Sequence, residues 1–231
     1  LLDDRLDQIE YPNGVKTYYV YDGAGRMTKM YTLKSNSDTI VRYDFILDLV
    51  GNHIEQRTNV NLETSTYTDF TSSANYNSKN QIEDWDGIIY NHDDNGNVDN
   101  QTGRDYVWDD HDKLINVSGD INAIYKYDGL GNRRSATIEG QGRKFVLDIL
   151  GMSRVLLETD FAGNPENYYV YGLGLISRVK SNGTTRYYHG DFRGSTVAIT
   201  DPSENITHTY QYDAFGKTTA ALEEDENIFK F

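Results

Sequence analysis

The sequence predicts an all-β protein built from tandem β-hairpins, and three observations lead to this fold class. A short phrase recurs along the chain: an aromatic residue, any residue, often Tyr, then Asp, two residues and Gly. Asp-x-x-Gly occurs about nine times where chance gives about two, and such self-similarity marks a repeat architecture. Tyr, a favoured strand residue, is abundant at 19 copies, while only three Pro interrupt the chain.

One copy of the phrase, residues 125–133, shows why it predicts a hairpin. Tyr125 and Tyr127 share one face of an extended strand, because successive side chains point to opposite faces. Asp128 and Gly131 fit the first and fourth positions of a type I turn. Gly takes the positive φ that lets the returning strand pair through a G1 bulge. The strand that follows, residues 134–138, alternates polar and apolar side chains.

The same phrase predicts a series of turns and strands. The expected turn residues are Asp22 with Gly25, Asp48 with Gly51, Asp93 with Gly96, Asp128 with Gly131, Asp148 with Gly151, Asp191 with Gly194, and Asp213 with Gly216. The expected strand aromatics are Tyr19, Tyr21, Tyr125, Tyr127, Tyr169, Tyr171, Tyr210 and Tyr212. Turns 77–80 and 109–112 carry Asn and Asp in place of Gly, the side chains that best tolerate positive φ. The spacing of about 16–20 residues between turns accommodates two strands and two turns per repeat.

The elements follow one another in this order. Tyr11 to Gly14 reads as a turn that leads into a strand from Lys16 to Tyr21. Residues 55–80 are rich in Thr, Ser and Asn, and predict either strands or a surface excursion. From Tyr90 onward the repeats are tighter, and Gly172 replaces the turn Asp. Residues 220–226 are the only helical candidate, and are equally compatible with a loop.

Composition limits the function. The net charge of −14 argues against a nucleic-acid-binding surface, which normally carries clustered Lys and Arg. The absence of Cys removes disulfides, thiol nucleophiles and Cys-ligated zinc. No apolar run reaches transmembrane length. We interpret residues 1–231 as one repeat region, and both strand-like ends suggest a piece of a longer polypeptide.

Two phrases near the C-terminus carry a family resemblance. Residues 189–201, His-Gly-Asp-Phe-Arg-Gly-Ser-Thr-Val-Ala-Ile-Thr-Asp, are followed by residues 210–217, Tyr-Gln-Tyr-Asp-Ala-Phe-Gly-Lys. Together they resemble the start of the Rhs-associated core, here residues 186–217, and the chain resembles Rhs/YD-repeat proteins, whose relatives include toxin-complex C components and teneurins. The resemblance implies a spiralling β-ribbon that forms a hollow shell around a C-terminal toxic domain. We carry over no catalytic residue from the family. Glu204 stands where Gly would complete the phrase at Asp201, and this residue and Gly172 leave the geometry of those two turns open.

Three candidate sites have simpler interpretations. Asp93, Asn95, Asn97 and Asp99 resemble part of a calcium loop, but Thr102 stands where the bidentate Glu is needed. His189, Asp191 and Ser195 contain the residue types of a hydrolase triad, but a strand–turn–strand gives no reason for triad geometry. Trp85 and Trp108 are suited to stacking on sugars or to packing against cross-strand neighbours.

The leading hypothesis is a non-enzymatic segment of a β-shell that encloses a C-terminal toxin or effector. No cofactor and no metal are expected. The expected partners are the enclosed domain and the rest of the shell, with no nucleic acid, no membrane insertion, and self-association through edge strands as a fragment. Export by a bacterium, to the outside or the cell envelope, is expected. The alternative is a cell-surface recognition module that binds glycans or a protein through exposed aromatic rings.

Overall fold

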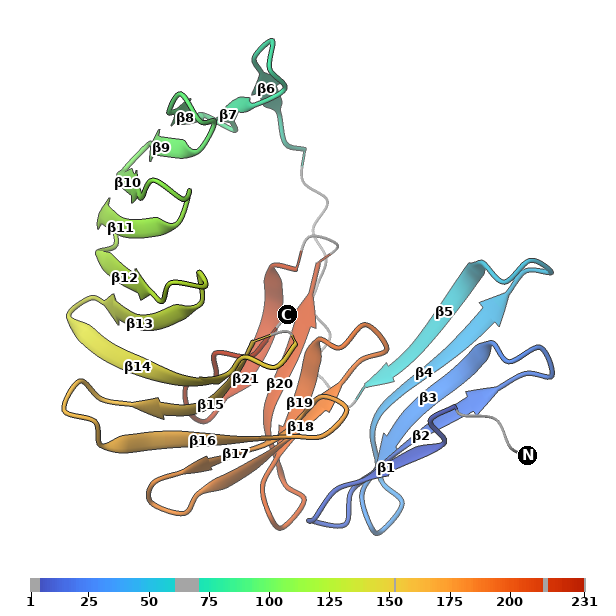
Figure 1. Cartoon of the computed structure of the whole chain (residues 1–231). Coiled ribbons are helices and arrows are strands. Elements are labelled where there is room, and N and C mark those ends of the chain that lie inside the picture. Colours follow the sequence, from blue (N-terminus) through green and yellow to red (C-terminus); the bar gives the residue numbers. More distant parts are fainter. Residues whose placement is uncertain (1–4, 61–70, 152, 214–215, 231) are drawn as a thin grey trace. The chain divides into compact units, whose positions relative to one another are not determined.

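A computed structural model of the chain describes residues 5–60, 71–151, 153–213 and 216–230. All regular elements in these ranges are β-strands, and all pairs between them are antiparallel (Figure 1), so the all-β hairpin prediction is confirmed. Within the same ranges no helix is long and apolar enough to cross a membrane.

The chain divides into two compact units. Unit 1 combines residues 1–66 with residues 169–231, and unit 2 comprises residues 67–168. The N-terminal part of unit 1 is a five-stranded sheet in sequence order: β1 (Gln8–Glu10), β2 (Lys16–Tyr21), β3 (Met27–Leu33), β4 (Thr39–Leu47) and β5 (His53–Val60). Its C-terminal part contains β17 (Leu175–Lys180), β18 (Thr185–Gly190), β19 (Thr196–Thr200), β20 (Ile206–Tyr212) and β21 (Thr218–Glu223), again as successive neighbours.

Unit 2 is a meander in which each strand pairs with the next. Its strands are β6 (Ala74–Tyr76), β7 (Ile82–Trp85), β8 (Ile88–His92), β9 (Val98–Gln101), β10 (Arg104–Trp108), β11 (Leu114–Gly119), β12 (Ala123–Tyr127), β13 (Arg133–Ile138), β14 (Gln141–Asp148) and β15 (Arg154–Thr159). Strand β16 (Pro165–Tyr171) contains the boundary between the units. Of the region 55–80, strands β5 and β6 belong to the described residues, and residues 61–70 lie outside them.

The repeated turn has one hydrogen-bond pattern. In the copy at Asp128, the Gly131 N–H donates to the Asp128 carbonyl at 3.0 Å, and the Asp128 N–H donates to the Asn132 carbonyl at 2.9 Å. The Asp128 carboxylate accepts from the N–H groups of Leu130 and Asn132 at 3.0 and 2.9 Å. The Asp side chain therefore closes the turn from inside, as an Asx turn does.

The fourth turn residue has positive φ in each predicted turn. Gly25, Gly51, Gly96, Gly131, Gly151, Gly194 and Gly216 have φ between 80° and 99°. Asn80 and Asp112, which replace Gly, have φ of 62° and 56°, as their tolerance of this region predicts. Glu204 adopts φ of 63° and donates its N–H to the Asp201 carbonyl, so this turn keeps the common geometry. At Gly172 the pattern changes, because its N–H donates to the Gly174 carbonyl instead. Residues 214–215 of the Asp213 turn lie outside the described residues.

The structure departs from the sequence pattern at two places. Asp84 and Gly87 match Asp-x-x-Gly, yet Trp85 pairs directly with Ile88 around a two-residue turn. That turn is Asp86–Gly87, with φ of 52° and 85°, the combination that a type I′ hairpin requires. Residues 220–226 form no helix, because 220–223 belong to β21 and pair with β20. The Ala and Leu content that favoured a helix is overridden by this strand pairing.

A matched pair of glycines tests the turn. Replacing Gly131 by alanine is expected to lower the free energy of unfolding by about 1–2 kcal/mol, because the backbone has φ of +80° there. Gly129 lies in the same turn without positive φ, and a Cβ there would meet no atom within 4 Å, so Gly129→Ala serves as the control. Trp85 and Trp108 both lie in unit 2, and their fluorescence during urea unfolding measures both variants. Equal losses for the two variants would contradict this account of the turn.

The aromatic residue before the turn Asp links neighbouring hairpins. The Tyr127 hydroxyl donates to the Leu114 carbonyl at 2.9 Å, and the Tyr212 hydroxyl donates to the Thr196 carbonyl at 2.6 Å. Trp108 occupies the same position in its phrase, and its Nε1–H donates to the Val98 carbonyl at 2.8 Å. Each acceptor is the first residue of a strand: Leu114 of β11, Thr196 of β19 and Val98 of β9. Each of these strands follows the previous Asp turn on the same side of the sheet as the aromatic residue's own turn. The repeat thus satisfies the polar groups of its aromatic residues within the sheet.

The core of unit 1 has β19 at its centre, with all five residues buried. Ala198 packs with Tyr11, Val15 and Ile40 from the N-terminal sheet. Ile199, on the opposite side of the strand, packs with Tyr188 and Tyr210. Polar contacts connect the same two parts of the chain: Asn13 Nδ2 donates to Thr200 Oγ1 at 3.0 Å, and the Ser35 N–H donates to Glu204 Oε2 at 2.8 Å.

Candidate functional site

The clearest departure from the hairpin pattern is the segment 224–230, which we call the strap. It leaves β21 and crosses the C-terminal strands of unit 1. The Glu224 N–H donates to the Thr207 carbonyl at 3.3 Å at one end, and the Thr196 N–H donates to the Lys230 carbonyl at 2.7 Å at the other. Phe229 packs against the cluster of Tyr188, Ile199 and Tyr210. The strap therefore packs over the C-terminal strands beside Ile199 of β19.

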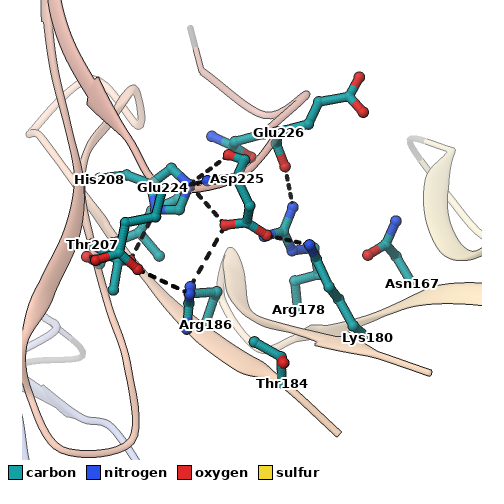
Figure 2. Close-up of polar contacts among 12 residues, drawn as sticks. Asn167, Arg178, Lys180, Thr184, Arg186, Thr207, His208, Glu224, Asp225 and Glu226 are labelled. Carbon is teal, nitrogen blue, oxygen red and sulfur yellow. Dashed lines mark hydrogen bonds and ion pairs between the residues drawn. The ribbon is translucent and has the colours of Figure 1, made fainter. Parts of the chain in front are cut away.

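Asp225 fastens the strap through an ion cluster (Figure 2). Its carboxylate contacts the Arg178 guanidinium at 2.6 Å and forms an ion pair with Lys180. The other carboxylate oxygen lies 3.7 Å from Arg186 Nε and 3.0 Å from His208 Nε2. Arg178 also donates to the Glu226 carbonyl. Because the Arg178 side chain is only 3% exposed, its charge depends on these partners for compensation.

Ionisation states in the cluster follow from burial and from the neighbouring charges. Burial raises the pKa of Asp225, but Lys180 and Arg178 outweigh it, so that the pKa is lowered and the carboxylate is charged. Burial lowers the pKa of His208, against the opposing effect of Asp225. Both ring nitrogens of His208 have polar partners: Nε2 lies 2.7 Å from the Asp225 carbonyl oxygen, and Nδ1 lies 2.8 Å from Thr207 Oγ1.

Asn227 is the second attachment point of the strap, and it is 4% exposed. The Tyr188 hydroxyl donates to Asn227 Oδ1 at 2.9 Å, and Asn227 Nδ2 donates to the Tyr210 hydroxyl at 3.1 Å. The Phe229 N–H also donates to Oδ1 at 3.1 Å, so the amide is well satisfied. An anionic carboxylate surrounded by cations and a saturated amide are suited to fastening the strap rather than to proton transfer.

The sequence-predicted turn residues act locally. The fifth residue of each turn, through its N–H or its side chain, is the main cause of a lowered pKa at Asp22, Asp48, Asp93, Asp109, Asp128 and Asp160. This explains why Asn or a basic residue so often follows the Gly. Asn52, Asn97, Asn164 and Asn205 each donate from Nδ2 to the turn carboxylate.

The structure does not bring the calcium candidates together as ligands. The Asp93 carboxylate accepts from the N–H groups of Asn95 and Asn97 at 3.0 and 2.8 Å. Asn97 Nδ2 donates to Asp112 Oδ1 at 2.8 Å, in the next turn, whereas Asp99 lies in β9. Across the described residues, no group of three or more His, Asp or Glu side chains is placed to hold a metal ion.

The triad candidates are likewise occupied separately. His189 is fully buried, its Nε2 lies 2.9 Å from Thr200 Oγ1, and its ring contacts Tyr11 edge-on at 4.6 Å. Asp191 Oδ1 accepts from the N–H groups of Arg193 and Ser195 at 2.8 and 3.0 Å. His189 therefore packs in the core of unit 1, and the Asp191 carboxylate closes its own turn.

Acid is expected to destabilise the chain first through its buried histidines. Burial lowers the pKa of His189 to about 3, from 6.5 in an exposed ring. The unfolded state therefore binds more protons below pH 6.5, and stability falls as pH decreases from 6.5 toward 3. Between pH 7 and pH 5, His189 alone should lower the free energy of unfolding by roughly 2 kcal/mol. The six turn aspartates whose pKa is lowered add to the loss only below about pH 4, because protonation favours the unfolded state there.

The histidine prediction is measured by urea unfolding at pH 7 and pH 5. His189→Gln should reduce the loss between the two pH values by roughly 2 kcal/mol, whatever its stability at pH 7. His111→Gln is the control, because His111 is exposed in the Asp109 turn. An unchanged pH dependence in His189→Gln would show that His189 is not the group that titrates.

No family model matches the chain. The tRNA3(Ser)-specific nuclease WapA of Bacillus spizizenii is 30% identical over 236 residues, which cover 99% of this chain and 9% of that protein. The tRNA nuclease WapA of Bacillus subtilis (strain 168) has the same identity and coverage. The chain therefore spans only about a tenth of the length of these curated relatives.

Solved structures share the fold at lower identity. The Tc holotoxin pore of Photorhabdus luminescens, with a TccC3 variant, matches with a TM-score of 0.63 and 15% identity over 95% of this chain and 15% of that chain. The TcdB2–TccC3 complex matches with a TM-score of 0.61 and 14% identity over 95% of this chain and 16% of that chain. The chain thus has the antiparallel hairpin fold found in Tc toxin complexes, and its sequence is similar to a segment of the WapA proteins.

Proposed function

We propose that this chain is a segment of the wall of an Rhs-type toxin shell, and that the wall encloses a C-terminal toxin or effector. The observation that carries the proposal is the succession of hairpins in two sheets, in each of which every strand pairs with the next. The fold matches a Tc toxin structure over 95% of the chain. Regular pairing of each strand with the next builds a sheet whose free edges are confined to its ends. Such a sheet is suited to forming a barrier.

In this proposal the chain acts by enclosure and not by catalysis. The WapA relatives are named as tRNA nucleases, but this chain spans 9% of their length, so the activity can reside elsewhere in them. The acidic composition, with a net charge of −14, is unfavourable for holding tRNA. Enclosure of a toxin also implies export, as the likeness of the fold to a holotoxin supports.

Protease protection tests enclosure in the natural full-length polypeptide that contains this segment. The region downstream of the segment should be cut at least about tenfold more slowly within the full-length protein than when expressed alone. Equal rates would overturn the proposal. A second assay incubates residues 1–231 with tRNA, where no cleavage is expected. Cleavage abolished by His189→Gln or by Asp191→Asn would establish an enzyme instead.

A recognition role is the second candidate, favoured by exposed aromatic rings on β6 and β7. Tyr76 is 58% exposed and Trp85 is 43% exposed. Exposed rings of this kind stack on sugars or on a partner protein. Glycan-array binding that is lost in Trp85→Ala would support it. Trp108→Phe is the control, because the Trp108 indole is already bonded to the Val98 carbonyl.

A further inference from the structure

Unit 1 contains a cavity of about 390 Å³ that none of the roles above uses. One wall comes from β2 and β3 with Tyr19, Met27 and Met30, and the other from the C-terminal part with Ile176, Tyr188 and Phe192. This volume lies within the range of about 300–1,000 Å³ that is typical of small-molecule sites. The lining is mainly aromatic and aliphatic, as in such sites.

The walls are suited to an apolar body of variable shape. Methionine side chains are flexible and polarisable, so Met27 and Met30 can adapt to a ligand surface. Two of the lining hydroxyl groups are already paired: Thr17 Oγ1 lies 2.8 Å from Thr32 Oγ1, and Thr17 also bonds the Tyr11 side chain. The interior therefore offers apolar contact and little unsatisfied polarity.

The cavity carries a positive group among its lining residues. Arg193 is exposed, and its guanidinium stacks over the Phe192 ring at 4.9 Å from the ring centroid. Among the described residues Arg193 forms no ion pair with a carboxylate. Asp191 also lines the cavity, but its Oδ1 accepts the N–H groups of Arg193 and Ser195. The Arg193 guanidinium is thus available to an external anion.

We propose that this cavity binds a small organic anion, with its apolar body between Met27 and Phe192 and its anionic group on Arg193. The charge complementarity with Arg193 selects an anion, and the apolar walls select an aromatic or aliphatic body. This site does not depend on the proposed shell function.

Two fluorescent probes with similar aromatic ring systems test the site in the protein of residues 1–231. 8-Anilinonaphthalene-1-sulfonate carries an anion, and N-phenyl-1-naphthylamine is neutral. Both should bind saturably with one molecule per chain. Arg193→Ala should weaken the sulfonate about fivefold and leave the neutral probe unchanged, since it removes one exposed charge-assisted contact. Met27→Trp, which fills the cavity, should weaken both probes at least about tenfold.

Exposed variants keep the test decisive if Met27→Trp fails to fold. Leu173, which is 77% exposed, lines the cavity, so Leu173→Glu should repel the sulfonate without disturbing the core. Arg133→Ala is the matched control, because Arg133 is also exposed and stacks on Tyr125 at 4.3 Å in unit 2. Non-saturable binding, undiminished binding to a folded Met27→Trp, or equal effects of Arg193→Ala and Arg133→Ala would overturn the proposal.

Discussion

Replacing Asp225 by alanine is expected to lower the free energy of unfolding of unit 1 by about 3 kcal/mol. The variant removes the anion that compensates Arg178, whose side chain is 3% exposed, and it leaves Lys180 and Arg186 as neighbouring like charges. Removing one partner of a buried pair costs about 3–5 kcal/mol, and the lower value applies because the Asp225 side chain is 18% exposed.

Far-UV circular dichroism during urea unfolding measures this loss, because both Trp residues lie in unit 2 and do not report on the strap. Asp44→Ala is the matched control. Asp44 also contacts two cations, Arg42 at 2.7 Å and Lys29 at 3.4 Å, but its side chain is 33% exposed. Surface pairs contribute about 0–1 kcal/mol, so a loss in Asp225→Ala no larger than in Asp44→Ala would contradict the buried cluster.

The sequence predicted the repeating part of this fold because the repeat is local. Asp128 and Gly131 determine one turn through bonds within five residues, and the same local rule holds in each copy. It failed at Asp84, where the motif is present but Asp86–Gly87 closes a shorter hairpin. Two positive-φ residues in succession give a turn that matches strand twist, and this outweighs the motif.

The strap was not predicted, for a physical reason. Asp225 contacts Arg178, Lys180, Arg186 and His208, which stand 17 to 47 residues away in the chain, and no short spacing links these residues. The acidic run 223–226 is the only sequence signal for the strap, and it is equally compatible with a helix or a loop. His189 was considered from the sequence only as a triad candidate, because its partners Tyr11 and Thr200 are brought to it by tertiary packing alone.

Replacing Phe192 by alanine is expected to destabilise unit 1 by about 3 kcal/mol, the low end of the range for Phe→Ala. Phe192 is the second residue of the Asp191 turn, a position that the local pattern treats as a solvent-exposed tip. Instead its ring packs edge-on against Phe45 at 4.8 Å and Tyr43 at 5.7 Å between centroids. Both partners belong to the N-terminal sheet, so this one turn joins the two parts of unit 1.

Leu49→Ala is the control for Phe192→Ala, because Leu49 has the same position in the Asp48 turn and is fully exposed. It is expected to change the free energy of unfolding by less than about 0.5 kcal/mol. The two variants compare one turn position with and without a tertiary partner, with urea unfolding followed by circular dichroism. If both were neutral, the Phe192 contacts would add nothing beyond the hairpins, and unit 1 would be held by the sheets and the strap alone.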